Sequence, residues 1–171
     1  MTIAFLDVDY TGTGARAACV LAESWDDEVP SSTYVQDIEA VAPYESGSFY
    51  RRELPCLLAV LRRLPTLPRA IVIDGYVWLA PERPGLGARL FEALGGSTPV
   101  VGIAKTLFAG VDTYSGVVRV LRGASRSPLL VTAIGIDPEV AAQCVRDMAG
   151  RHRIPQMMKI VDRLARGRAS S

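Results

Sequence analysis

The sequence predicts a single α/β domain with a mixed sheet, in which three antiparallel strands are followed by parallel strands and helices flank the sheet. Apolar and polar residues alternate over much of the first 41 residues, which is typical of neighbouring strands with one buried face. After residue 49, helical spacing alternates with short apolar runs, which is typical of buried strands covered by helices. The 171 residues are 49% hydrophobic, so we expect one core and one domain over residues 1–171.

The first three strands are expected to form a meander, because only a turn cluster and a polar loop separate them. From Phe49 onward, apolar residues recur at three- and four-residue spacing, which predicts a helix that ends before Pro65. Four arginines of this segment are expected to face solvent: Arg51, Arg52, Arg62 and Arg63. The predicted strands cover residues 2–9, 15–24 and 32–41.

The second half of the chain alternates between strands and helices. Asp137 is expected to cap a helix that has Pro138 at its first position, since both residue types favour these places. A hairpin is expected over residues 112–122, around a Tyr-Ser-Gly turn. The other predicted strands are 69–74, 99–104 and 128–134, and the other predicted helices are 84–95, 137–149 and 155–166.

Composition excludes several classes of protein and site. No apolar run reaches the roughly 18–20 residues of a spanning helix, and the N-terminus lacks the features of a signal peptide, so we expect a cytoplasmic protein without a membrane span. Three separated cysteines fit neither a disulfide framework nor a zinc site, and we expect them to be small buried side chains. His152 is the only histidine, which argues against a histidine-rich metal site.

Acidic residues at strand ends are the sharpest chemical feature. Asp7 lies within an apolar strand, and Asp74 ends another. If these strands are neighbours, two carboxylates lie side by side and need a cation, and Mg²⁺ prefers such hard oxygen ligands. Glu53, in the first turn of the following helix, is placed to be a further ligand. Taken singly, each acid also fits a helix or turn cap.

The sequence resembles the endonuclease V family in several ordered blocks. Residues 43–55 (PYESGSFYRRELP) are similar to the family signature PYxxGxxxxRExP, and residues 73–75 (IDG) to its VDG block. Residues 102–110 (GIAKTLFAG) resemble its GVAKxxLxG block. Residues 6–10 resemble its first strand, in which the family acid aligns with Asp7 rather than Asp9, and residues 153–155 resemble a late RLP block.

The resemblance implies an RNase H-like fold and a role in DNA repair. It implies Mg²⁺-dependent incision, with Mn²⁺ as a substitute, at the second phosphodiester bond 3′ to a deaminated adenine (inosine), in DNA or RNA. Lys105 matches a lysine near the scissile phosphate, and we expect a monomer that binds nucleic acid. The matched metal residues are Asp7, Glu53 and Asp74, and the matched nucleic-acid residues are Pro43 and Tyr44 (a wedge) and Gly47 and Gly75 (a base pocket).

Three positions depart from the family pattern and the chain is also short, so the sequence resembles a divergent, shortened member of the family. Ala80 and Ile134 stand where the family has histidines, and Arg89 stands where a further histidine often lies. These losses leave two alternatives open. One is a homologue that binds nucleic acid with weak or no catalysis, and the other is an RNase H-like nuclease with a different substrate.

Overall fold

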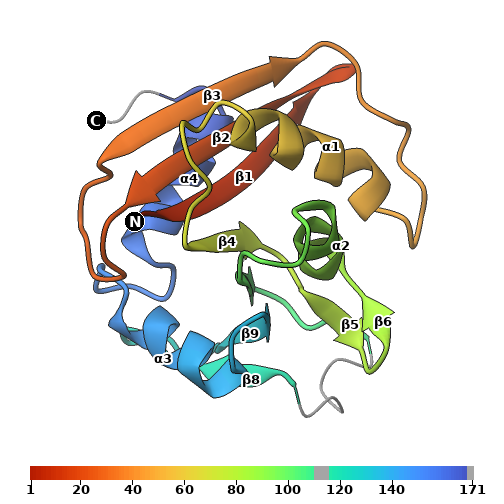
Figure 1. The fold of residues 1–171 in the computed structure, drawn as a ribbon. Helices are drawn as coiled ribbons and strands as arrows, with labels where there is room; N and C mark the ends of the chain where they lie inside the picture. The colour runs from red at the N-terminus through yellow and green to blue at the C-terminus, as the bar shows by residue number, and fades with distance from the viewer. Residues whose placement is uncertain (110–115, 169–171) are drawn as a thin grey trace.

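The protein is built around a seven-stranded mixed sheet that lies between two pairs of helices (Figure 1). The structure is a computed structural model, and it describes residues 1–109 and 116–168. In this part of the chain the strand order is β3-β2-β1-β4-β7-β9-β8. Within the same residues, no helix is long and apolar enough to cross a membrane.

The predicted meander is confirmed. Strand β1 (Ile3–Thr11) pairs antiparallel with β2 (Gly14–Ala22), which pairs antiparallel with β3 (Ser32–Ile38). Gly12 has a φ of +59° in the tight turn between β1 and β2, a conformation that glycine adopts without strain. The first hairpin leaves the other edge of β1 free to pair with the next strand after the meander.

The parallel part of the sheet has β4 at its centre. Strand β4 (Ala70–Asp74) runs parallel to both β1 and β7 (Val100–Ala104). Strand β9 (Leu129–Ile134) is antiparallel to β7 and to the short edge strand β8 (Val118–Val120). The predicted hairpin at 112–122 lies partly outside the described residues, and β8 is its described portion.

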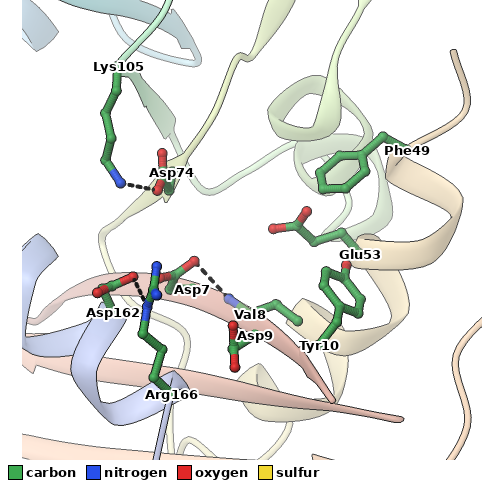
Figure 2. Close-up of a pocket in the computed structure, with 10 residues that line it drawn as sticks. All are labelled: Asp7, Val8, Asp9, Tyr10, Phe49, Glu53, Asp74, Lys105, Asp162 and Arg166. Atoms are coloured by element: carbon green, nitrogen blue, oxygen red, sulfur yellow. Dashed lines mark hydrogen bonds and ion pairs between the residues drawn. The ribbon is translucent and has the colours of Figure 1, made fainter. Parts of the chain in front are cut away.

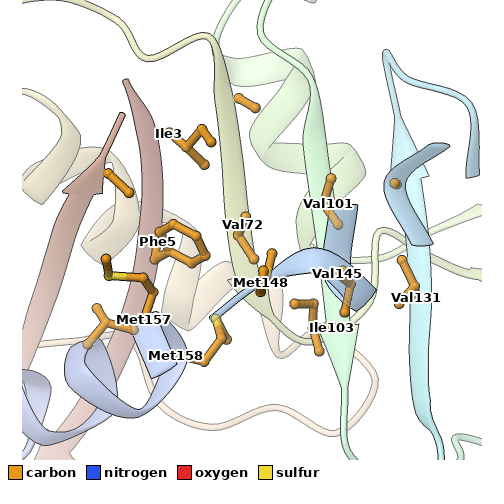
Figure 3. Close-up of a cluster of buried hydrophobic side chains, with 14 of the residues drawn as sticks. Ile3, Phe5, Val72, Val101, Ile103, Val131, Val145, Met148, Met157 and Met158 are labelled. Atoms are coloured by element: carbon orange, nitrogen blue, oxygen red, sulfur yellow. The ribbon is translucent and has the colours of Figure 1, made fainter. Parts of the chain in front are cut away.

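Helices cover both faces of the sheet, as the sequence predicts. Helices α1 (Tyr50–Leu61) and α2 (Leu86–Ala93) pack on one face, and α3 (Pro138–Asp147) and α4 (Gln156–Ala165) pack on the other. Figure 3 shows the core between the sheet and the helices α3 and α4, where side chains from both of these helices meet the strands. Its labelled members are Ile3, Phe5, Val72, Val101, Ile103, Val131, Val145, Met148, Met157 and Met158.

The cap of α3 agrees with the prediction, whereas some side-chain placements do not. Asp137 Oδ1 accepts hydrogen bonds from the backbone N–H groups of Glu139 and Val140, at 2.9 and 3.2 Å. Cys19 and Cys56 are buried as expected, but Cys144 of α3 is only half-buried.

A short hairpin that the sequence reasoning missed follows β4. It consists of β5 (Trp78–Ala80) and β6 (Arg83–Pro84), with Glu82 in the turn at a φ of +58°. Because Arg83 and Pro84 belong to this hairpin, α2 begins at Leu86 rather than at the predicted residue 84. Two strands this short carry no alternation that a sequence pattern can detect.

The loop after Asp74 is held against the sheet by backbone hydrogen bonds. The Gly75 N–H donates to the Ile103 carbonyl at 3.0 Å, and the Val77 N–H donates to the buried Thr132 hydroxyl at 2.8 Å. A Cβ atom on Gly102 would lie 2.5 Å from the Gly75 carbonyl oxygen, so the loop approaches the β7 backbone closely. These contacts fix the backbone on either side of Gly75.

We predict that Thr132→Val lowers the free energy of unfolding by about 1–3 kcal/mol, because it leaves the buried Val77 N–H without an acceptor. Chemical denaturation measures the loss. Thr11→Val is the matched control, since Thr11 is exposed at the end of β1 and should change stability by less than about 0.5 kcal/mol. Equal effects of the two substitutions would contradict the anchoring role of Thr132.

Candidate metal and nucleic-acid site

Three acidic side chains point into one polar pocket at the edge where β1 and β4 meet α1 (Figure 2). The parallel register pairs Leu6 with Ile73, so Asp7 and Asp74 follow as neighbours on adjacent strands. Glu53 reaches the same pocket from the first turn of α1 and is only 6% exposed. The pocket has a volume of about 240 Å³. The structure therefore brings together the three predicted acids.

Lys105 completes the predicted set. It follows β7, and its Nζ lies 2.6 Å from Asp74 Oδ2. Asp7 has a different kind of partner, because its Oδ1 accepts a hydrogen bond from the Val8 backbone N–H at 2.9 Å. Neither Asp7 nor Glu53 forms an ion pair with a residue that the structure describes. Two of the three carboxyl groups thus lie in the pocket without a directly paired cation.

This arrangement disfavours the charged forms of two acids. Burial, followed by repulsion from Asp74, raises the pKa of Asp7 from 3.8 to about 7. Burial, followed by repulsion from Asp7 and Asp74, raises the pKa of Glu53 from 4.5 to about 8. A cation bound between them would relieve the repulsion and replace the lost hydration.

The donor set fits a hard divalent cation. Carboxylate oxygens prevail in the pocket, and neither histidine nor cysteine lines it, so Mg²⁺ or Mn²⁺ suits these donors better than a softer metal. Within residues 1–109 and 116–168, no three acidic, histidine or cysteine side chains are already gathered tightly enough to enclose an ion. The acids face one pocket, and cation binding would have to draw them closer together.

Sequence reasoning missed two residues of this pocket. Asp162 and Arg166 of the C-terminal segment line it, and Arg166 Nε donates to Asp162 Oδ1 at 2.9 Å. The available signal was helical spacing, because Asp162 follows the buried Met158 by four residues and so faces the sheet. Asp9, which the family alignment passes over in favour of Asp7, also lines the pocket.

A second, more apolar pocket adjoins the first, and Phe49 and Asp74 line both. Its volume is about 720 Å³, within the range of roughly 300–1,000 Å³ usual for small-molecule sites. Among the predicted nucleic-acid residues, Tyr44, Gly47 and Gly75 line this pocket, and Tyr44 is 64% exposed. Pro43 is exposed beside it and is not among the lining residues.

The family signature arginine, Arg52, does not face solvent as expected. Its guanidinium carbon lies 3.8 Å from the centroid of the Tyr10 ring, and its Nε is buried. The long apolar stem and flat head of arginine make this stacking favourable, whereas a helical wheel treats every arginine as polar. Arg52 thus packs between the helix that carries Glu53 and the strand that carries Asp7.

The three positions that depart from the family lie in different surroundings. Ala80 is half-buried in β5, and Ile134 packs at the edge of the core beneath α1 and α2. Neither lines the two pockets. Arg89 does line the larger pocket, from α2.

Comparisons with known proteins agree with this architecture. Residues 1–163 match the family model for endonuclease V. The endonuclease V of Azotobacter vinelandii is 31% identical over 190 residues, covering 98% of this chain and 83% of that protein. Solved endonuclease V structures also match. One from Ciona intestinalis, in complex with a 23mer DNA containing an inosine followed by a ribo-adenosine, has a TM-score of 0.81 at 17% identity and covers 97% of this chain and 84% of its own.

A second structure, of endonuclease V from Streptomyces avermitilis, has a TM-score of 0.74 at 24% identity and covers 98% of this chain and 80% of its own. At these identities the likenesses establish the fold. It is RNase H-like, which confirms the predicted fold class.

We predict that the metal-free protein loses stability as pH rises from about 4 to 8. Over this range the unfolded chain releases the protons of Asp7 and Glu53, whose unperturbed pKa values are 3.8 and 4.5, while the folded protein retains them up to about 7 and 8. Chemical denaturation at several pH values, in the presence of a chelator, measures how the free energy of unfolding changes with pH. A free energy of unfolding that is constant or rises between pH 5 and 8 would contradict this prediction.

Glu53→Gln should raise the stability of the metal-free protein at pH 8 by at least about 1 kcal/mol, since one pKa unit corresponds to about 1.4 kcal/mol. The matched control is Glu28→Gln, because Glu28 is exposed. Added Mg²⁺ should stabilise the wild-type protein more than the Glu53→Gln variant.

Proposed function

Since the chain belongs to the endonuclease V family, a family of nucleases, we propose that it is a Mg²⁺-dependent endonuclease acting on inosine-containing nucleic acid. In this proposal it cleaves the second phosphodiester bond 3′ to the deaminated base, and Mn²⁺ can replace Mg²⁺. The observation that carries the proposal is the convergence of Asp7, Glu53 and Asp74 in one pocket beside Lys105.

The acids would hold the cation, and a bound Mg²⁺ supplies Lewis acidity and lowers the pKa of a water. Asp7 and Asp74 present oxygens from adjacent strands, and Glu53 presents its oxygens from α1. Because the pKa values of Asp7 and Glu53 are raised, cation binding would be coupled to proton release. The two strands and the helix fix the backbone positions of the three groups, so movements of their side chains would suffice to close them around a cation.

Lys105 is proposed to neutralise a phosphate oxygen. Its ammonium lies at the pocket mouth with a side chain that is 39% exposed, and a long flexible stem lets it move from Asp74 to a phosphate. A cation at Asp74 would weaken the hold of that carboxylate on the ammonium. Substrate and cation would therefore release Lys105 for its proposed role.

The larger pocket is proposed to receive the extruded base. Tyr44 is exposed at its rim and, with Pro43, is placed to fill the gap that the base leaves, which offsets part of an unstacking cost of a few kcal/mol. Gly47 and Gly75 have φ values of +79° and +139°, and open space lies around each Cα. Their bare backbones allow a base edge to approach closely.

A second candidate function is inosine binding with little turnover. Alanine and isoleucine at positions 80 and 134, where the family has histidines, favour it. Both residues lie outside the carboxylate pocket, however, so the acids and the lysine that would do the chemistry are complete without them. We therefore prefer the nuclease.

We predict nicking of an inosine oligonucleotide in Mg²⁺ or Mn²⁺, and a loss of at least about 100-fold in Asp74→Ala, because an uncompensated ligand loss removes several kcal/mol of charge stabilisation. Single- and double-stranded DNA and RNA, each with and without inosine, form the substrate panel, and Glu28→Ala is the control variant. Binding without nicking at high enzyme would support the second candidate. Nicking independent of inosine would point to another substrate.

Lys105→Ala should lower the cleavage rate about 10- to 100-fold and reduce the slope of log affinity against log salt by about 1, as the loss of one phosphate contact does. Lys159→Ala is the matched control, since Lys159 is the other lysine of the chain and lies in α4 outside both pockets. An unchanged salt slope in Lys105→Ala would rule out its proposed phosphate contact.

A further inference from the structure

Arg89 is an unusual residue to find in the wall of the larger pocket. It lies on α2, and its guanidinium carbon is 4.8 Å from the centroid of the Tyr50 ring, which lines the same pocket. The helix is held close to the β4–β5 loop, because a Cβ atom on Gly87 would lie 2.6 Å from a Val77 methyl group. Both the ring and the helix therefore fix where the guanidinium lies.

The Arg89 guanidinium has unused hydrogen-bonding capacity. No hydrogen bond or ion pair joins its side chain to any residue within 1–109 and 116–168, and its Nε is buried without an acceptor. Asp74 is the one acid among the described residues that line this pocket, and it is engaged with Lys105. The two terminal nitrogens of the guanidinium are not among the buried unpaired atoms, so they remain free to donate to a ligand in the pocket.

The surrounding surface favours a flat aromatic ligand over a free phosphate. Aromatic side chains line the pocket from several segments: Tyr44, Phe49, Tyr50, Tyr76 and Phe108. A planar base can stack among such rings, and its edge then meets polar groups in the plane of the base. The fork of an arginine matches two adjacent acceptors, and the O6 and N7 atoms of a 6-oxopurine are such a pair.

We propose that Arg89 provides this protein's discrimination against adenine by donating hydrogen bonds to O6 and N7 of the extruded base. The inference rests on the proposed function, because it assumes that the larger pocket takes a base. It assigns the ligand class as 6-oxopurines with a free N7. Adenine is rejected, since it carries an amino donor at position 6 that would face the guanidinium donors.

The test compares an inosine oligonucleotide with the same oligonucleotide carrying 7-deazainosine, in which a carbon replaces the N7 acceptor. Binding is measured with Asp74→Asn in Mg²⁺, so that cleavage does not interfere. Loss of N7 should weaken binding to the Arg89-containing protein about 10-fold. In Arg89→Ala, the inosine oligonucleotide should bind about 10- to 100-fold more weakly, and 7-deazainosine should bind as well as inosine.

Two further variants separate charge from geometry. Arg89→Lys keeps the charge but cannot form the paired contact, so it should also lose the distinction between the two bases. Arg83→Ala is the matched control, because Arg83 lines the same pocket and lies 5.5 Å from the Phe108 ring centroid. It should retain the N7 dependence even if overall affinity falls.

Each outcome separates this inference from the proposed function. Equal binding of inosine and 7-deazainosine by the Arg89-containing protein overturns the role of Arg89, even if the Arg89 variants fail to fold. Equal loss of both ligands in Arg89→Ala overturns it too, because the N7 dependence would then persist without Arg89. An adenine oligonucleotide of the same sequence is measured alongside, and equal binding of inosine and adenine by every form of the protein overturns the proposed function itself.

Discussion

The parallel pairing of β1 with β4 is the constraint on which the rest of the site depends. It places Asp7 and Asp74 on adjacent central strands, at an edge where β1 continues past the end of β4. Two carboxyl groups so close cannot both ionise cheaply, and Glu53 approaches the same space from α1. The apolar strands that carry the two aspartates keep them near each other despite this repulsion. A cation bound at the site would reduce the repulsion, and its binding would therefore be favourable.

The same sheet positions the second pocket through the loop that follows Asp74. Val77 is anchored by Thr132 of β9, and Gly75 is anchored by β7, so the loop is fixed by strands on the side away from the acids. The close approach at Gly102 leaves no room for a side chain beneath it. Asp74 lines both pockets, so the loop that follows it fixes the position of the larger pocket relative to the carboxylate pocket.

The sequence was sufficient to predict the order of the principal elements and the meeting of the three acids, because apolar periodicity and strand-end acids are local signals. It did not reveal the β5–β6 hairpin, whose strands are too short to alternate. It also did not reveal Asp162, which reaches the pocket only through the packing of α4 on the sheet, or the stacking of Arg52 on Tyr10. These features depend on contacts between residues distant in sequence, which periodicity does not report.

The placement of the family departures shows how recognition and chemistry can change separately on this fold. Ala80 and Ile134 line neither pocket, so their lack of ionisable groups leaves the polar pocket intact. Arg89 alters only the larger pocket, where it adds a donor fork without a carboxylate partner. In the proposed function, a change in that fork would alter which base edge is favoured and would leave the carboxylates in place. The contacts that offset the free-energy cost of extruding a base would then be independent of the acids, which would determine whether the bound strand is cut.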